Sequence, residues 1–143
     1  MEVDIIVFDQ NVYIYGQKAK SFPNWVTEAH NTIHTKTSHN QDRNYFGISR
    51  PDEKWNISYR AAADEIEIWE LDDKWLEEII LLAWDYASIY ITDFINNIWV
   101  IKEAFDLLIR RPYIDPEWYC IELYEDKDVR CMIRLDNWEL SKE

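Results

Sequence analysis

The chain has 143 residues, of which 48% are hydrophobic and 15% aromatic, and 28 acidic against 15 basic residues give it a formal charge of −13. This length and hydrophobic content predict one domain, residues 1–143, with its own core, and they exclude a disordered chain. The negative charge opposes attraction to nucleic acid phosphates and anionic membrane surfaces, so we expect no direct nucleic acid binding and no membrane binding.

No hydrophobic run reaches the length of a signal peptide core or of a membrane-spanning helix. The N-terminal run 5–8 is short and follows no basic segment, and the run 79–84 ends at Asp85. These features predict a cytoplasmic protein. Cys120 and Cys131 are then expected to be free, buried thiols.

The first part of the chain predicts two strands followed by a helix. Residues 3–8 and 12–15 are strand-like, and Gly16 closes the second of these runs. Pro23 suits the first turn of the helix, and polar residues from Thr35 onward end its pattern. Apolar residues recur at helical spacing at Phe22, Val26, Ala29 and Ile33.

A hairpin is predicted next, from strands at 45–49 and 55–59 around the turn signal 50–54. The stretch 64–78 that follows mixes alternating isoleucines, Ile66 and Ile68, with many acidic residues, and we interpret it as a strand plus a connector. Closure of the hairpin at its turn would put one set of residues on a common face: Tyr45, Gly47, Trp55, Ile57 and Tyr59.

The second half repeats this order, with strands at 79–83 and 86–92 and a helix from about Asp93 to Arg111. Thr92 or Asp93 can cap that helix, and Pro112 stops it. Arg110 and Arg111 suit its negative end. Its apolar stripe consists of Ile98, Ile101, Phe105 and Leu108.

A second hairpin follows, and it sets one carboxylate inside an aromatic strand. Residues 118–124 and 129–135 flank the turn 125–128. Symmetric closure of this turn places Glu122 opposite Cys131, and Glu122 becomes the only charge on an apolar face. Burying an unpaired carboxylate costs several kcal/mol as an order of magnitude, or raises its pKa by up to ~3 to 5 units. Glu122 is therefore the first candidate for a functional residue.

Two tandem strand, helix, strand, strand units thus account for the chain. Their approximate limits are residues 3–63 and 76–138, and the acidic segment 64–75 connects them. We predict an α+β fold with an antiparallel sheet.

Several segments, in this order, resemble the GyrI-like family, which includes effector-binding domains of AraC-type and multidrug-sensing regulators and free-standing small-molecule-binding proteins. The resemblance implies two helices on one face of the sheet, a central groove for hydrophobic and often cationic compounds, and Glu122 as the central glutamate. The chain carries no helix-turn-helix region, so DNA regulation would need a separate protein. The resemblance rests on Tyr15-Gly16, Trp25, Tyr45-Phe46-Gly47-Ile48, Ile57-Ser58-Tyr59-Arg60-Ala61-Ala62 and Ile121-Glu122-Leu123-Tyr124.

The expected function is the binding of a hydrophobic, cationic small molecule without a cofactor or metal. A delocalised cation would pair with Glu122, and each aromatic ring could add about 0.5 to 2 kcal/mol of cation–π attraction. Two glycines do not make a phosphate-binding loop, and His30 with His34 gives only two ligands where zinc needs at least three. The predicted aromatic wall consists of Tyr45, Trp55, Tyr59, Tyr90, Trp99, Trp118 and Tyr124.

Other interpretations remain open at this stage. Glu122 could be purely structural, bonded to a tyrosine or paired with Arg60 or Arg130, or a register slip of one residue could turn it to solvent. With a raised pKa it could instead serve an enzyme that hydrolyses strained, cyclopropane-type electrophiles, as a branch of the resembled family does.

A third interpretation makes the acidic surface functional, as an inhibitor or decoy that docks on a basic protein such as DNA gyrase. We rank it below small-molecule binding. The acidic runs that motivate the idea are 64–67, 70–73 and 77–78.

Overall fold

A computed structural model describes residues 1–37, 43–51, 54, 56–65, 76–115 and 119–136. The chain divides into two compact units. One consists of Asn11–Leu81, and the other joins Met1–Gln10 to Leu82–Glu143. Each unit is an antiparallel sheet with a helix packed on it, which confirms the predicted α+β fold.

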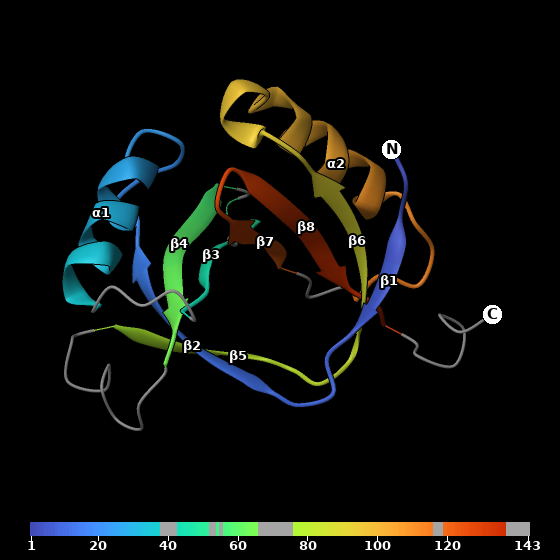
Figure 1. Ribbon diagram of the computed structural model, residues 1–143, viewed down its shortest axis with the longest axis horizontal. Helices are drawn as coiled ribbons and strands as arrows, with labels where there is room; N and C mark the ends of the chain where they lie inside the picture. Colours follow the sequence, from blue (N-terminus) through green and yellow to red (C-terminus); the bar gives the residue numbers. More distant parts are fainter. Residues whose placement is uncertain (38–42, 52–53, 55, 66–75, 116–118, 137–143) are drawn as a thin grey trace. The chain divides into compact units, whose positions relative to one another are not determined.

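The unit of residues 11–81 has four strands in the order β3-β4-β2-β5, all antiparallel (Figure 1). Its helix contacts β4 and β2. The elements are β2 (Val12–Lys18), α1 (Val26–Lys36), β3 (Tyr45–Pro51), β4 (Ile57–Asp64) and β5 (Glu77–Leu81).

The other unit has the strand order β1-β6-β8-β7, again antiparallel. Its main helix contacts β8 and β6. The elements are β1 (Asp4–Val7), β6 (Asp85–Ile91), the 3₁₀ turn η1 (Phe94–Asn96), α2 (Trp99–Ile109), β7 (Cys120–Glu125) and β8 (Asp128–Arg134).

The two units share one plan, in which one outer strand, β1 or β5, is added to a run of strand, helix, strand, strand. β1 precedes β2 in sequence but pairs with β6, while β5 precedes β6 but pairs with β2. The remaining strands and helix of each unit follow the order strand, helix, strand, strand.

The core of the first unit lies between α1 and its sheet. Ala29 and Ile33 on α1 pack with Tyr59 and Ala61 on β4. Register places Tyr45, Gly47, Ile57 and Tyr59 on one face, because Tyr59 lies opposite Ser49 and Ile57 opposite Pro51. This agrees with the predicted first hairpin for every member except Trp55, which lies outside the described residues.

The core of the second unit lies between α2 and strands β6 and β8. Leu108 and Ala104 are fully buried and pack with Ile89, Cys131 and Ile133. Both cysteines are free and buried, as predicted. No helix of the described ranges is long and apolar enough to cross a membrane.

The second helix begins later than predicted. Asp93 adopts a left-handed conformation (φ 51°), and α2 starts only at Trp99, without a side-chain cap. The predicted cap at Thr92 or Asp93 is wrong, because neither residue adjoins the first residue of α2. The Asp93 amide instead donates to the Asp128 carboxylate at 2.9 Å. The segment between forms η1 instead.

Three predictions fall on residues outside the described ranges. They concern the strand around Ile66 and Ile68, most of the connector 64–75, and the positions of Trp55 and Trp118.

Replacing Leu108 with alanine should destabilise the protein by roughly 2 to 5 kcal/mol, because it deletes a fully buried side chain from the α2 core. Urea unfolding measures the effect. Leu107→Ala is the matched control, since Leu107 is the neighbouring helix residue but is 40% exposed. Equal losses in both variants would contradict the placement of α2.

Candidate functional site

Glu122 occupies the second unit, on β7, with its side chain on the face that α2 covers elsewhere. Glu122 lies opposite Cys131, and Cys131 lies opposite Ile89 on β6. Opposed residues share a face. Cys131 and Ile89 belong to the α2 core, so the predicted register of the hairpin is confirmed and the slip that would reverse it is excluded.

Within the β7–β8 hairpin, as far as it is described, Glu122 is the one charged side chain on this face. Tyr124, opposite Val129, is its neighbour two residues along the strand. The Tyr124 hydroxyl donates a hydrogen bond to Oε2 of Glu122 at 3.3 Å. Among the described residues, the carboxylate thus has this hydroxyl as its polar partner on an otherwise apolar face.

The η1 turn holds Tyr124 from the other side. The rings of Phe94 and Tyr124 lie 5.5 Å apart between centroids. Phe94 is anchored because its amide donates to the Lys127 carbonyl at 2.9 Å, in the turn of the hairpin. A chain of contacts thus runs from Phe94 in η1, through the Tyr124 ring, to the Glu122 carboxylate.

Burial raises the pKa of Glu122 to about 7, and the Tyr124 hydrogen bond opposes this shift. The side chain nevertheless keeps partial contact with solvent. Burial also raises the pKa of Cys131, with the nearby Glu122 adding to the effect, so this thiol stays neutral. A carboxyl group that is half ionised near neutral pH can hold a cation or exchange a proton.

The two arginines considered as structural partners of Glu122 have other contacts. Arg130 lies opposite Leu123 and so on the other sheet face, where it donates to Ser88 at 3.1 Å. Arg60, in the other unit, forms an ion pair with Glu77. Of the partners considered for Glu122, the described residues show a tyrosine, Tyr124.

Tyr90 lies on the face opposite to Glu122. It pairs in register with Arg130, whose guanidinium stands 4.9 Å from the Tyr90 ring centroid. Its hydroxyl donates to Asp128 at 2.8 Å. Tyr90 is thus not a neighbour of the carboxylate.

Trp99 begins α2 and is 63% exposed, as is Ile98 beside it. With Ile95, 61% exposed, they form an apolar surface at the start of the helix. The predicted apolar stripe of the helix includes Ile98, but α2 starts only at Trp99 and Ile98 lies at the surface.

Tyr59 and Tyr45, in the first unit, are held by α1. The Tyr59 hydroxyl and Nε2 of His30 share a hydrogen bond of 2.7 Å, and Phe22 stacks on the Tyr59 ring at 5.7 Å. Tyr59 is only 3% exposed. Its hydroxyl and ring are therefore tied into the unit's core.

The Tyr45 hydroxyl lies 3.0 Å from that of Thr37, and the His34 ring centroid lies 4.1 Å from the Tyr45 ring. The two histidines thus contact the two predicted tyrosines. Their spacing of four residues indicates a shared helix face, and on this face they contact tyrosines. Burial lowers the pKa of His30 to about 4, with His34 adding to the shift, so His30 is neutral at physiological pH.

The described residues contain no cluster of three or more histidine, cysteine or acidic side chains able to hold a metal ion.

The structure brings Glu122 and Tyr124 together in one unit and Tyr45 and Tyr59 in the other. Phe94 and Phe22, which contact these tyrosines, were missed as site residues because each had been assigned to a helix pattern.

No protein-family model matches the chain, and no curated protein matches it. Among solved structures, that of SAV2435 bound to tetraphenylphosphonium is similar, with a TM-score of 0.68 and 11% identity over 98% of this chain and 97% of that chain. A candidate bacterial transcription regulation protein from Staphylococcus aureus MU50 has a TM-score of 0.58 and 10% identity, covering 96% and 99%. An integron cassette protein from the mobile metagenome of Vibrio cholerae has a TM-score of 0.66 and 9% identity, covering 93% and 95%. These similarities show a shared fold.

Proposed function

We propose that the protein binds hydrophobic, cationic small molecules, with Glu122 as the counter-charge. The observation that carries this proposal is a carboxylate on an apolar sheet face whose described hydrogen-bond partner is one tyrosine hydroxyl. An ionised carboxylate in such surroundings is stabilised by a bound cation, and a cation that needs few hydrogen bonds of its own suits the apolar face.

Aromatic side chains near Glu122 support a delocalised cation over a small hydrated one. Tyr124 lies beside the carboxylate and Phe94 beside Tyr124. Aromatic faces attract organic cations by about 0.5 to 2 kcal/mol each. The formal charge of −13 also attracts cations to the protein at long range.

The similar fold of SAV2435, whose structure contains tetraphenylphosphonium, also supports the proposal. So does the resemblance to the GyrI-like family, to which we propose that this chain belongs. Glu122 would then be its central glutamate, and Tyr124 would be part of its aromatic lining.

Proton transfer is the second candidate, since a carboxyl group with a pKa of about 7 can act as a general acid or base at neutral pH. Water addition to a strained electrophile would use Glu122 in this way. Turnover that disappears in Glu122→Gln while binding survives would favour the enzyme over the binding protein.

The acidic-decoy alternative has less support. Of its acidic runs, Glu77 pairs with Arg60, and Glu78 accepts a hydrogen bond from Tyr15 at 2.9 Å. Most of the remaining acidic residues lie outside the described ranges.

Glu122→Gln should weaken tetraphenylphosphonium binding about tenfold or more, which corresponds to about 1.4 kcal/mol, because the substitution removes the attraction between the carboxylate and the cation. Isothermal titration calorimetry measures the loss. Tetraphenylborate, which has the same shape and the opposite charge, should bind far more weakly to the wild type.

Glu125→Gln is the matched control, since it removes the same charge from an exposed position at the end of β7. An equal loss in Glu125→Gln, or equal binding of both tetraphenyl ions, would contradict a role for Glu122 as counter-charge.

Affinity for tetraphenylphosphonium should rise about tenfold between pH 6 and pH 8 and then level off, because the ionised fraction of a group with a pKa of about 7 grows from roughly a tenth to nine tenths. Affinity rises with pH because, at pH values below the pKa of Glu122, the carboxyl group carries a proton that must leave before the cation can pair with it. Titrations across this range test the dependence. Glu122→Gln should show a flat profile, and a flat wild-type profile would exclude Glu122 as the titrating group.

A further inference from the structure

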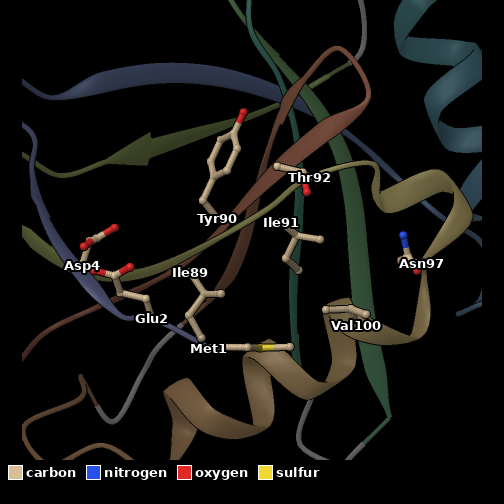
Figure 2. A pocket seen from close by; sticks show the side chains of 9 residues that line it. All are labelled: Met1, Glu2, Asp4, Ile89, Tyr90, Ile91, Thr92, Asn97 and Val100. Carbon is tan, nitrogen blue, oxygen red and sulfur yellow. The ribbon is translucent and has the colours of Figure 1, made fainter.

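The short segment η1, between β6 and α2, has little packing of its own. None of its three residues is buried, and Ile95 is 61% exposed. A cavity of about 340 Å³ lies beside it, and its lining includes Thr92, before the segment, and Asn97, after it (Figure 2). The position of η1 therefore depends strongly on the groups that bond to its backbone.

Those groups come from the turn between β7 and β8. The Asp93 amide donates to Oδ1 of Asp128, and the Phe94 amide donates to the Lys127 carbonyl, both at 2.9 Å. Asp93 has the left-handed conformation (φ 51°) at this point. Asp128 is thus the side chain that ties the entry of η1 to the hairpin.

The Asp128 carboxylate is itself held from β6. Its Oδ2 accepts a hydrogen bond from the Tyr90 hydroxyl at 2.8 Å. Tyr90 extends from β6 on the side away from Ile89 and Ile91 (Figure 2). The hydrogen bonds from the Asp93 amide and from Tyr90 hold the pKa of Asp128 below its usual range, so the group is ionised at neutral pH.

The segment that Asp128 holds carries the ring that contacts Tyr124. The Phe94 and Tyr124 ring centroids lie 5.5 Å apart, and the Tyr124 hydroxyl donates to Oε2 of Glu122 at 3.3 Å. A displacement of η1 would remove Phe94 from Tyr124, and the hydroxyl would then be free to leave the carboxylate.

We propose that Asp128 is a positioning residue of the Glu122 site, which keeps the Tyr124 hydroxyl on the Glu122 carboxylate by holding η1 against the hairpin. Asp128 lies opposite Glu125, at the end of the hairpin, and acts on Glu122 through Phe94 and Tyr124. Its importance for cation binding rests on the proposed function, whereas its effect on the free protein requires no ligand.

The ionisation of Glu122 is a direct measure of the Tyr124 contact. Burial raises the pKa of the Cys131 thiol opposite Glu122, so that thiol is neutral. β6 and α2 contribute apolar side chains to the core on this face. The titratable groups that share the face with Glu122 in the hairpin are Tyr124, Cys120 and Cys131.

NMR titration of the Glu122 carboxyl carbon in the ligand-free full chain tests the proposal. Asp128→Ala should raise the pKa of Glu122 by about half a unit to one unit above its value of about 7, because the Tyr124 hydrogen bond lowers that pKa. Tyr124→Phe should raise it equally, and the double variant should raise it no further. Loss of the Asp128 charge alone would lower the pKa, so the sign separates positioning from charge.

Asp128→Asn is the conservative variant, since its amide can accept from the Asp93 amide and donate to the Tyr90 oxygen. It should return the pKa of Glu122 to the wild-type value or slightly below it. Tyr90→Phe removes one of the two bonds to Asp128 at a position that is 37% exposed, so the core stays intact. It should raise the pKa by less than Asp128→Ala does.

Asp126→Asn is the control matched in charge. It removes one carboxylate from the same turn, and asparagine also tolerates the positive φ of 60° at this position. It should not raise the pKa of Glu122.

Tetraphenylphosphonium affinity gives a second measurement. Asp128→Ala should bind the cation about two- to fivefold more weakly at pH 7, because the ionised fraction of Glu122 falls, and should match the wild type near pH 9. Failure of the wild type to bind the cation would contradict the proposed function, while the pKa comparison would still decide the role of Asp128. That role is overturned if Asp128→Ala and Tyr90→Phe do not raise the pKa, if Asp128→Asn or Asp126→Asn raises it as Asp128→Ala does, or if the shifts of Asp128→Ala and Tyr124→Phe add in the double variant.

Discussion

The register of the β7–β8 hairpin is the constraint on which the candidate site depends. Glu125 lies opposite Asp128, so the turn consists of Asp126 and Lys127, and Asp126 adopts a positive φ of 60°. Aspartate tolerates that conformation better than most residues. A shift of one residue would turn Glu122 to the other face, because side chains alternate along a strand. The turn thus decides whether the protein has a carboxylate on its apolar face.

The same turn also shapes the start of α2. Asp128 accepts a hydrogen bond from the Asp93 amide, and the Lys127 carbonyl accepts one from the Phe94 amide. These contacts delay the helix to Trp99 and bring Phe94 against Tyr124. A strand turn and a helix start that are distant in sequence therefore form one local structure around Glu122.

Local patterns in the sequence predicted much of this fold, and the exceptions share a physical cause. Alternation gave both hairpins and the faces of Glu122 and Tyr59, because a period of two residues is a property of the strand itself. The exchange of β1 and β5 between units and the delayed start of α2 depend on partners far along the chain, which periodicity does not contain. Likewise, the spacing of His30 and His34 showed a common helix face, whereas their tyrosine partners followed only from packing.

We propose that burial keeps the Glu122 carboxyl group between its neutral and charged forms until a cation binds. Its pKa can be measured directly by following the side-chain carboxyl carbon by NMR across pH, using Glu122→Gln to assign the signal. We predict a pKa of about 7 in the free protein, falling by about one unit or more when tetraphenylphosphonium is bound. A pKa near 4.5 in the free protein, or one that the cation leaves unchanged, would contradict the claim.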